Sequence, residues 1–290
     1  MVILVYFLVV FFTVSQSTVT KLYNRRGGSA LVFNALKGAT ALVLFAVMAL
    51  VQGFTFHLPT LFFGMAYGAL LSVSMISGYK ALCLGPMALT SMLVSFSVVI
   101  PLLWGLTAGE ESLSPLRIVA LCLLLCTILL TNADKFAAMG KGEAGEKRNY
   151  GLWLLLVLTT FLSNGVSSIL QKQHQVFYPE SYSAEFMFFA MAVCALVYVT
   201  ASLFRVKPAL FKETRGKLFA AYSGVANGLA SFFTLVLAGM ENATVLFPII
   251  SAGTLLGVLL CGRFILKEKL RLNHYAALLL GAVAVVLLKL

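Results

Sequence analysis

The sequence predicts an all-α, polytopic membrane protein whose ten transmembrane helices form two inverted repeats of five. Three observations lead to this prediction. Ten apolar stretches of helix length follow one another along the 290 residues, and a bilayer core of ~30 Å takes about 20 apolar residues of helix to cross. Charged residues make up only 11% of the chain, against about 25% in ordinary globular domains. The second half of the chain also repeats features of the first.

The expected helices are separated by short polar or glycine-containing segments. They cover residues 2–22, 28–52, 58–83, 86–106, 113–131, 150–172, 182–204, 216–239, 243–264 and 270–289. The longest polar stretch, Asn132 to Asn149, is rich in glycine and in charges of both signs. We interpret it as a linker between an N-terminal repeat, residues 1–131, and a C-terminal repeat, residues 150–290.

The two repeats align without a gap over most of their length. A constant shift of 157 positions, Leu61 to Leu218, places residues 61–131 on residues 218–288. It pairs Glu111 with Glu268 at the junction between the fourth and fifth helix of each repeat. Because each repeat has an odd number of helices, the second must cross the membrane in the opposite direction. Inverted repeats with a binding site at their interface are typical of transporters.

The charge distribution predicts the orientation and excludes nucleic acid as a partner. The net charge is +11, but the lysines and arginines lie between the apolar segments and form no stripe with interleaved aromatics. They are concentrated in the loops that follow the first, third, fifth, seventh and ninth helices. Cytoplasmic loops carry such an excess, so this pattern predicts cytoplasmic loops on that side and both termini outside.

No residue pattern indicates a cofactor, a metal site or catalysis. The five cysteines lie in or beside apolar segments and include no CxxC pair, and the three histidines have no ligand spacing. We interpret the cysteines as small hydrophobic residues and the histidines as interfacial or loop residues. An intramembrane enzyme needs clustered catalytic groups at membrane depth, and the sequence shows none.

Polar residues follow one stripe of the first, third, fourth, sixth and eighth helices, whereas the fifth and tenth are almost wholly apolar inside. Polar groups in a membrane need partners or water, so these stripes predict a central cavity. The candidate substrate-binding residues are Gln16, Ser17, Thr20, Lys37, Ser74, Lys80, Ser91, Ser95, Asn164, Ser167, Gln171, Asn227 and Ser231. Contacts between helices are the alternative for the serines and threonines, and snorkelling to the interface is the alternative for Lys37 and Lys80.

Small residues and prolines predict local packing. The pairs Gly64-xxx-Gly68, Gly224-xxx-Gly228 and Gly253-xxx-Gly257 favour close approach of helices. Pro101 and Pro248 lie inside the fourth and ninth helices, where each removes a backbone hydrogen bond and permits a kink.

Two stretches carry a resemblance to a known family. They read GPMALTSMLVSFSVVIPLLWGLTAGEESLS at residues 85–114 and ENATVLFPIISAGTLLGVLLCGRFILKEKLR at residues 241–271. Each runs from a small-residue turn through an apolar helix with proline to an acid-Leu junction, Glu111-Ser112-Leu113 and Glu268-Lys269-Leu270. In this the chain resembles the drug/metabolite transporter superfamily, in its ten-helix EamA-type branch. The resemblance implies a 5+5 inverted repeat with alternating access to a central cavity. Family members usually keep both termini inside, unlike the orientation that the charges favour here.

We therefore expect a transporter of a small polar metabolite. The intramembrane lysines Lys37 and Lys80 favour an anionic or zwitterionic metabolite. The expected location is the cell (inner or plasma) membrane, and a homodimer is possible. Two alternatives stay open. Multidrug efflux predicts a site lined by aromatics such as Tyr67, Tyr79 and Tyr222, and flipping of a lipid-linked substrate predicts a lateral opening between helices.

Overall fold

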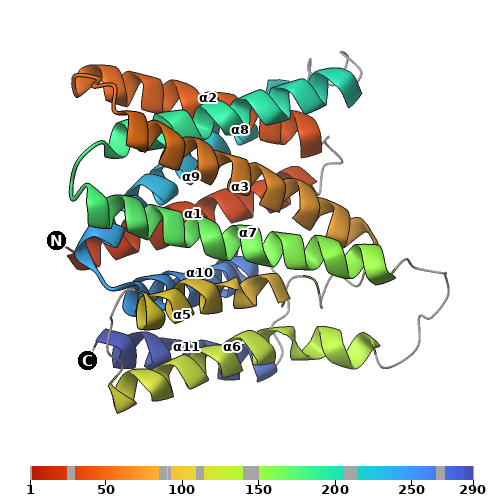
Figure 1. The fold of residues 1–290 in the computed structure, drawn as a ribbon. Coiled ribbons are helices and arrows are strands. Elements are labelled where there is room, and N and C mark those ends of the chain that lie inside the picture. The colour runs from red at the N-terminus through yellow and green to blue at the C-terminus, as the bar shows by residue number, and fades with distance from the viewer. Residues whose placement is uncertain are drawn as a thin grey trace. The chain divides into compact units, whose positions relative to one another are not determined.

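The computed structural model describes residues 2–24, 30–84, 90, 93–108, 114–139, 150–205, 214–265 and 272–289. These residues form helices and short connections, with no strand among them (Figure 1). The helices are α1 (Val2–Asn24), α2 (Ala30–Val51), α3 (Leu58–Leu84), the 3-10 helix η1 (Phe96–Val98), α5 (Val99–Thr107), α6 (Pro115–Met139), α7 (Tyr150–Phe177), α8 (Ser183–Arg205), α9 (Thr214–Met240), α10 (Ala243–Phe264) and α11 (Leu272–Lys289). The all-α prediction is confirmed for the described part of the chain.

Seven of the described helices are long and apolar enough to cross a bilayer. Their apolar spans are Val2–Tyr23, Leu31–Val51, Leu58–Ala81, Gly151–Phe177, Ser183–Ser202, Gly216–Met240 and Ala243–Phe264. Three further apolar helices, Leu93–Thr107, Pro115–Leu130 and Asn273–Leu288, are shorter. This composition is that of a multi-pass membrane protein.

The chain forms two compact units, and neither is continuous in sequence. Unit 1 comprises Met1–Ser72 and Leu170–Met240, and unit 2 comprises Val73–Ile169 and Glu241–Leu290. Each unit therefore takes helices from both halves of the sequence.

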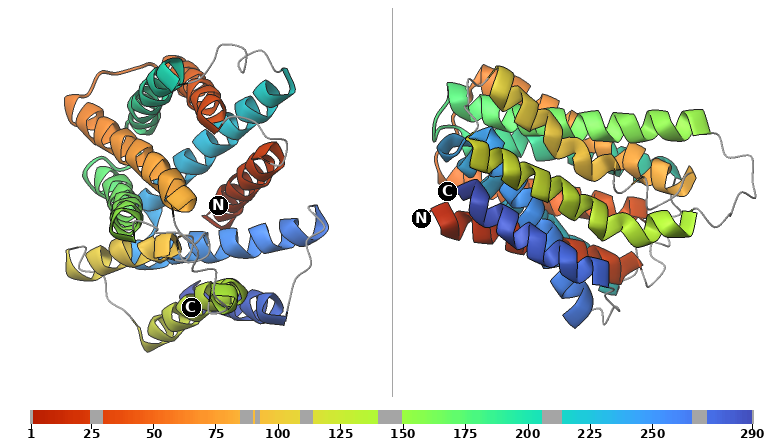
Figure 2. Two further views of the ribbon diagram at one scale, coloured as in Figure 1. Left: turned by 90° about the vertical axis from the view of Figure 1, so that its right-hand side faces the viewer. Right: turned by 90° about the horizontal axis from the view of Figure 1, so that it is seen from below.

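Within unit 1, α1 packs along α9, and α2 packs along both α8 and α9 (Figures 1 and 2). Glycines allow this close packing, as the small-residue pairs predict. A Cβ atom at Gly68 would run into the backbone of Ala190 on α8, and one at Gly224 would meet the Lys37 carbonyl on α2. Large side chains, including Phe45 and Phe186, fill the core between these helices.

Within unit 2, α6 lies beside α11, and α10 packs against α5 and α11 (Figure 2). The fourth expected helix, residues 86–106, is interrupted. Pro101 has no N–H to donate to the carbonyl of Ser97, four residues earlier. The backbone tightens there into η1, and the Val99 N–H bonds to the carbonyls of Phe96 and Ser97.

Two helices run further than the sequence predicts. α6 continues to Met139, into the expected linker, because residues 133–139 are mostly good helix formers such as Ala, Lys and Met. The rest of that linker, residues 140–149, lies outside the described residues. α7 continues to Phe177. His174 therefore belongs to a helix and is fully buried, so the interpretation of all three histidines as interfacial or loop residues was wrong for His174.

Candidate functional site

The candidate site of unit 1 is built around a buried lysine. Lys37 lies within the apolar span of α2, and its side chain is only 8% exposed. Its Nζ donates to Oε1 of Gln16 on α1, at 2.8 Å. Gln16 is neutral, and no carboxylate contacts Lys37 among the described residues. A buried ammonium without a counter-ion is costly in a membrane.

A second cluster of polar groups joins α3 to α8 beside Lys37. Ser72 Oγ donates to the Gly68 carbonyl at 2.9 Å, and Cys194 Sγ donates to the same carbonyl at 3.4 Å. The Cys194 thiol lies within electrostatic range of Lys37. The Tyr198 hydroxyl lies close to Ser72 and is buried without a hydrogen bond of normal geometry.

A third group extends the polar surroundings to α7 and α9. Gln171 is 4% exposed, and its Nε2 donates to the carbonyl of Ser231 at 3.2 Å. The Tyr67 hydroxyl, on α3, lies close to the side chains of Gln171 and Ser231 and within electrostatic range of Cys194. We call Gln16, Lys37, Tyr67, Gln171, Cys194 and Ser231 the polar core; they come from α1, α2, α3, α7, α8 and α9.

Asn227 adds an available amide on α9. It lies four residues before Ser231, so both occupy the same face of the helix. Asn227 is partly buried and makes no hydrogen bond through its side chain within the described ranges. An amide left available in a membrane helix is a natural hydrogen-bonding partner for a polar solute.

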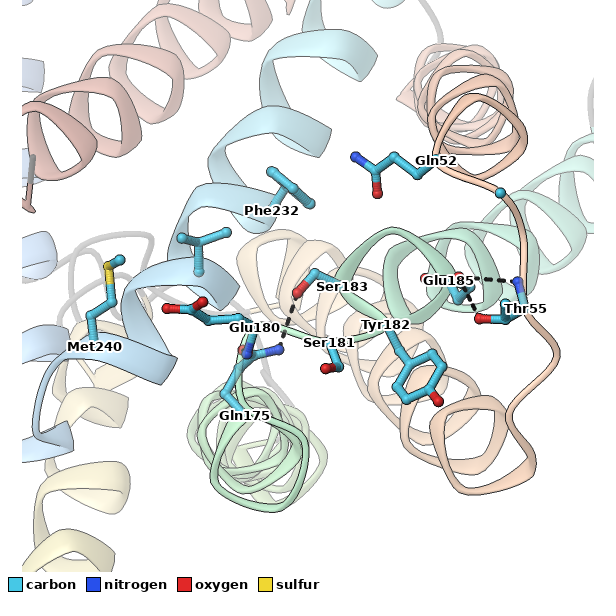
Figure 3. Close-up of a pocket in the computed structure, with 12 residues that line it drawn as sticks. Gln52, Thr55, Gln175, Glu180, Ser181, Tyr182, Ser183, Glu185, Phe232 and Met240 are labelled. Carbon is cyan, nitrogen blue, oxygen red and sulfur yellow. Dashed lines mark hydrogen bonds between the residues drawn. The ribbon is translucent and has the colours of Figure 1, made fainter.

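A pocket of about 620 Å³ opens at the end of unit 1 where α2, α7 and α9 finish and α8 begins (Figure 3). We call it the unit 1 pocket. Its lining residues are Gln52, Gly53, Thr55, Gln175, Glu180, Ser181, Tyr182, Ser183, Glu185, Phe232, Val236 and Met240. The two charged side chains among them are both carboxylates.

The two carboxylates of the pocket differ in their surroundings. Glu185 is buried, and its Oε1 accepts from the backbone N–H and the hydroxyl of Thr55, both at 3.3 Å, which ties α8 to the α2–α3 connection. Glu180 is exposed and has a positive φ of 56° in the tight turn between α7 and α8. Tyr182, in the same turn, has a similar φ of 53°, and a positive φ is uncommon for a non-glycine residue. Figure 3 shows the Glu180 side chain beside Gln175, in the space between α7 and α9.

The pocket and the polar core follow the same two helices. Gln175 lines the pocket and lies four residues after Gln171, and Phe232 of the pocket follows Ser231 of the polar core. Residues four apart on a helix are neighbours, with Cβ atoms about 5–6 Å apart. The Gln171–Ser231 hydrogen bond therefore lies one helical turn below the pocket.

The structure brings together five of the predicted residues in or beside the polar core: Gln16, Lys37, Gln171, Asn227 and Ser231. Ser17 and Thr20 lie on α1, and their hydroxyls donate to carbonyls of their own helix at 2.8 Å. This back-bonding is common for serine and threonine in helices, and we do not include these two residues in the candidate site.

The remaining predicted residues lie in unit 2. Ser74 donates to Asn164 Oδ1, and Ser167 donates to the Asn164 carbonyl at 2.8 Å, so these three residues satisfy one another at the contact of α3 and α7. Lys80 is exposed and lies four residues before the end of α3. Ser95 is partly buried and precedes η1, and Ser91 lies outside the described residues.

Sequence reasoning missed Cys194, Ser72 and the unit 1 pocket. Cys194 was interpreted as a small hydrophobic residue, and nothing in the sequence indicates its proximity to Lys37. Gln175 had a usable signal, since it continues the stripe of Asn164 and Gln171 by a further turn. Of the three aromatics considered for drug binding, Tyr67 belongs to the polar core, whereas Tyr79 and Tyr222 are exposed.

Comparison with known proteins shows the fold. A solved structure described as "Crystal structure of protein" superposes with a TM-score of 0.80 over 100% of this chain and 98% of its own, at 15% sequence identity. No family model and no curated protein matches the sequence. Fold and composition together define a multi-pass helical membrane protein with buried polar residues from six helices in unit 1.

Proposed function

We propose that this chain is a transporter of a small anionic or zwitterionic metabolite, working by alternating access in the cell membrane. The polar core and Asn227 bind the solute in this proposal. The unit 1 pocket is its entrance from one side. Membership of the drug/metabolite transporter superfamily, ten membrane-spanning helices and the 5+5 inverted repeat are parts of the same proposal.

The buried Lys37 is the observation that carries the proposal. In a protein without a ligand role, a lysine this deep would have a carboxylate partner or would be replaced by an apolar residue. Lys37 has a neutral amide and a thiol as its neighbours. A carboxylate or phosphate of the solute supplies the missing negative charge, and the available amide of Asn227 supplies a further hydrogen bond.

The pairing of helices supports the repeat. The order of the helices in each half makes α2 equivalent to α8, and the alignment of the halves makes α5 equivalent to α10 and α6 to α11. Each of these equivalent pairs packs together, the first within unit 1 and the other two within unit 2. Equivalent elements that pack on one another are compatible with an internal twofold axis that passes between them.

The position of the pocket agrees with a route across the membrane. The pocket is formed at the ends of α2, α7 and α9, on the side opposite to the basic loops. By the positive-inside rule this is the outer side. Glu180 and Glu185 then give the entrance a negative character, which favours solutes that also carry an amino group.

Uptake into proteoliposomes tests the proposal. The panel is labelled glycine, L-glutamate, succinate, glycerol 3-phosphate and ethidium, and each is compared with empty vesicles. We expect uptake of at least one of the first four, lost in Lys37→Gln and retained in the matched control Lys80→Gln. Uptake of ethidium alone would favour multidrug efflux instead. Equal uptake by Lys37→Gln and the wild type would show that Lys37 is not part of the binding site.

A further inference from the structure

Two histidines far apart in the sequence are joined by one hydroxyl group in unit 1. His57 precedes α3, and His174 lies near the end of α7. The Oγ1 atom of Thr60 lies 2.9 Å from His57 Nδ1 and 3.0 Å from His174 Nε2. Thr60 and His174 are both fully buried, whereas His57 is partly exposed.

Thr60 differs from other threonines of this chain in what its hydroxyl does. Thr13, Thr18 and Thr159 each donate to the carbonyl four residues earlier on their own helix. Thr60 lies in the first turn of α3 and has only the two imidazoles as hydrogen-bond partners within the described residues. Its proton is therefore free to pass to a histidine.

Gln175 sets the direction of these hydrogen bonds. Its Oε1 accepts from the backbone N–H of Glu180 at 3.3 Å, which fixes the orientation of the amide. Its Nε2 then donates to Ser183 Oγ and to His174 Nδ1, both at 3.2 Å. His174 must accept at Nδ1, so its proton is on Nε2 and is donated to Thr60. Thr60 in turn donates to His57 Nδ1.

Aromatic side chains surround the hydrogen-bonded groups His57, Thr60 and His174 between their two ends. His57 stacks on the ring of Tyr182, with centroids 4.3 Å apart, and meets the edge of Tyr178 at 4.7 Å. His174 is enclosed by Tyr178, Phe63 and Phe186. Glu180 and Glu185 are the charged residues that line the pocket beside Gln175.

Each end of the chain reaches a different environment. His57 Nε2 has no partner among the described residues and belongs to a partly exposed side chain, so it can exchange its proton with water. At the other end, Gln175 lines the unit 1 pocket. The three groups thus connect water at the partly exposed His57 with the fully buried His174 through an aromatic environment.

We propose that His57, Thr60 and His174 form a proton path between the outer solution and the buried Nδ1 atom of His174, which Gln175 separates from the unit 1 pocket, and that the proton is the coupling ion of transport. This inference rests on the proposed function. A solute that draws the Gln175 amide away from His174 opens the inner end of the path. The first and sixth helices of the sequence contain no carboxylate that could carry the coupling proton. In this proposal the two histidines carry it instead.

The transfer balances as follows. His174 Nδ1 takes a proton from the pocket, and His174 gives its Nε2 proton to Thr60 Oγ1. Thr60 gives its own proton to His57 Nδ1, and His57 releases its Nε2 proton to water. One proton has moved, each new N–H or O–H bond replaces one that was broken, and the two hydrogen bonds of Thr60 now point the other way. A second proton can move in the same direction only after the hydrogen bonds have returned to their starting directions. This requirement fits the transfer of one proton in each transport cycle.

Nitrogen NMR of the histidines tests the path without any solute. The chain has three histidines, so ¹⁵N-histidine labelling in phosphatidylcholine nanodiscs gives few signals, assigned with His57→Gln, His174→Gln and His274→Gln. When both are neutral, His57 and His174 should carry the proton on Nε2. Thr60→Ser, which keeps the hydroxyl, should leave these tautomers unchanged. A neutral His57 or His174 that carries its proton on Nδ1 in the wild type would overturn the path.

Transport measurements then separate this inference from the proposed function. For every panel solute that the wild type takes up, we compare uptake driven by a pH gradient with exchange at equal pH. The ratio of the two should fall at least tenfold in Thr60→Val and stay at the wild-type value in Thr60→Ser. An unchanged ratio in Thr60→Val overturns the proton path while transport stands. Absence of uptake in the wild type overturns the proposed function, and the NMR result still decides whether the path exists.

Discussion

Replacing Lys37 by methionine should make the protein more stable and at the same time abolish transport. Methionine has nearly the length of lysine and removes the charge, so the contact of α2 with α1 stays filled. If Lys37 served mainly to stabilise the fold, its replacement by methionine would lower the stability of the protein. The opposite signs expected for stability and transport make this substitution informative.

The size of the stability change follows from two opposing terms. A lysine at the centre of a membrane helix costs about 2.5–3.5 kcal/mol relative to an apolar residue on insertion scales. Removing the Nζ–Gln16 bond, 2.8 Å long, leaves the Gln16 Oε1 without that donor, which costs about 1–3 kcal/mol. Because Gln16 is only partly buried, the lower end of this cost applies, and we expect a net gain of about 1.5–2.5 kcal/mol.

The size of the transport loss follows from the charge. A carboxylate about 4–5 Å from the Lys37 ammonium is held by roughly 3–4 kcal/mol at an effective dielectric constant near 20. Since about 1.4 kcal/mol corresponds to a factor of ten, binding of an anionic solute should weaken roughly 100- to 1,000-fold.

Thermal unfolding in detergent and proteoliposome uptake measure the two effects on the same preparation, with Lys80→Met as the control on an exposed lysine. Lys80→Met should change neither quantity appreciably. A Lys37→Met protein that transports all panel solutes within threefold of the wild type would refute the role of the charge. A variant that is destabilised by more than about 2 kcal/mol would show that Lys37 mainly holds α1 to α2.

Two further substitutions test the packing of each unit by thermal unfolding. Gly68→Ala places a Cβ atom against the backbone of Ala190 and should destabilise the protein by about 1–3 kcal/mol; equal stability would mean that α3 and α8 do not approach this closely. In unit 2, Trp153 Nε1 donates to Thr90 Oγ1 at 2.9 Å, so Thr90→Val should cost about 1–3 kcal/mol and Thr90→Ser much less. Equal effects of the valine and serine variants would contradict this hydrogen bond.

The sequence predicts the positions of the helices well because hydrophobic length is a local property. The predicted helices are wrong where tertiary packing decides where a helix ends or changes its form. The end of α7, with polar residues from Gln171 to Gln175, looks like a loop, yet these side chains are satisfied by partners such as the Ser231 carbonyl and Ser183 Oγ. Pro101 permits a kink by its chemistry, but the length of the 3-10 segment depends on the surrounding packing.

The candidate site could be predicted only in part. Helical spacing identifies which residues share a face, and the predicted residues Gln171 and Ser231 meet in unit 1. Spacing does not tell which helices meet, so the residues of unit 2 could not be separated from those of unit 1. The path of His57, Thr60 and His174 joins residues more than a hundred positions apart, and no local pattern reveals it.

The natural thiol of Cys194 beside Lys37 offers the most direct test of a wet, positively charged site in unit 1. In a variant with the other four cysteines, Cys83, Cys122, Cys126 and Cys261, replaced by alanine, mass spectrometry follows modification of Cys194 by charged, water-soluble thiol reagents. We predict that an anionic sulfonate reagent reacts faster than a cationic ammonium reagent, that a transported anion slows the reaction, and that Lys37→Met removes the preference. A Cys194 that stays unmodified, or reacts at the same rate with both reagents, would contradict the account.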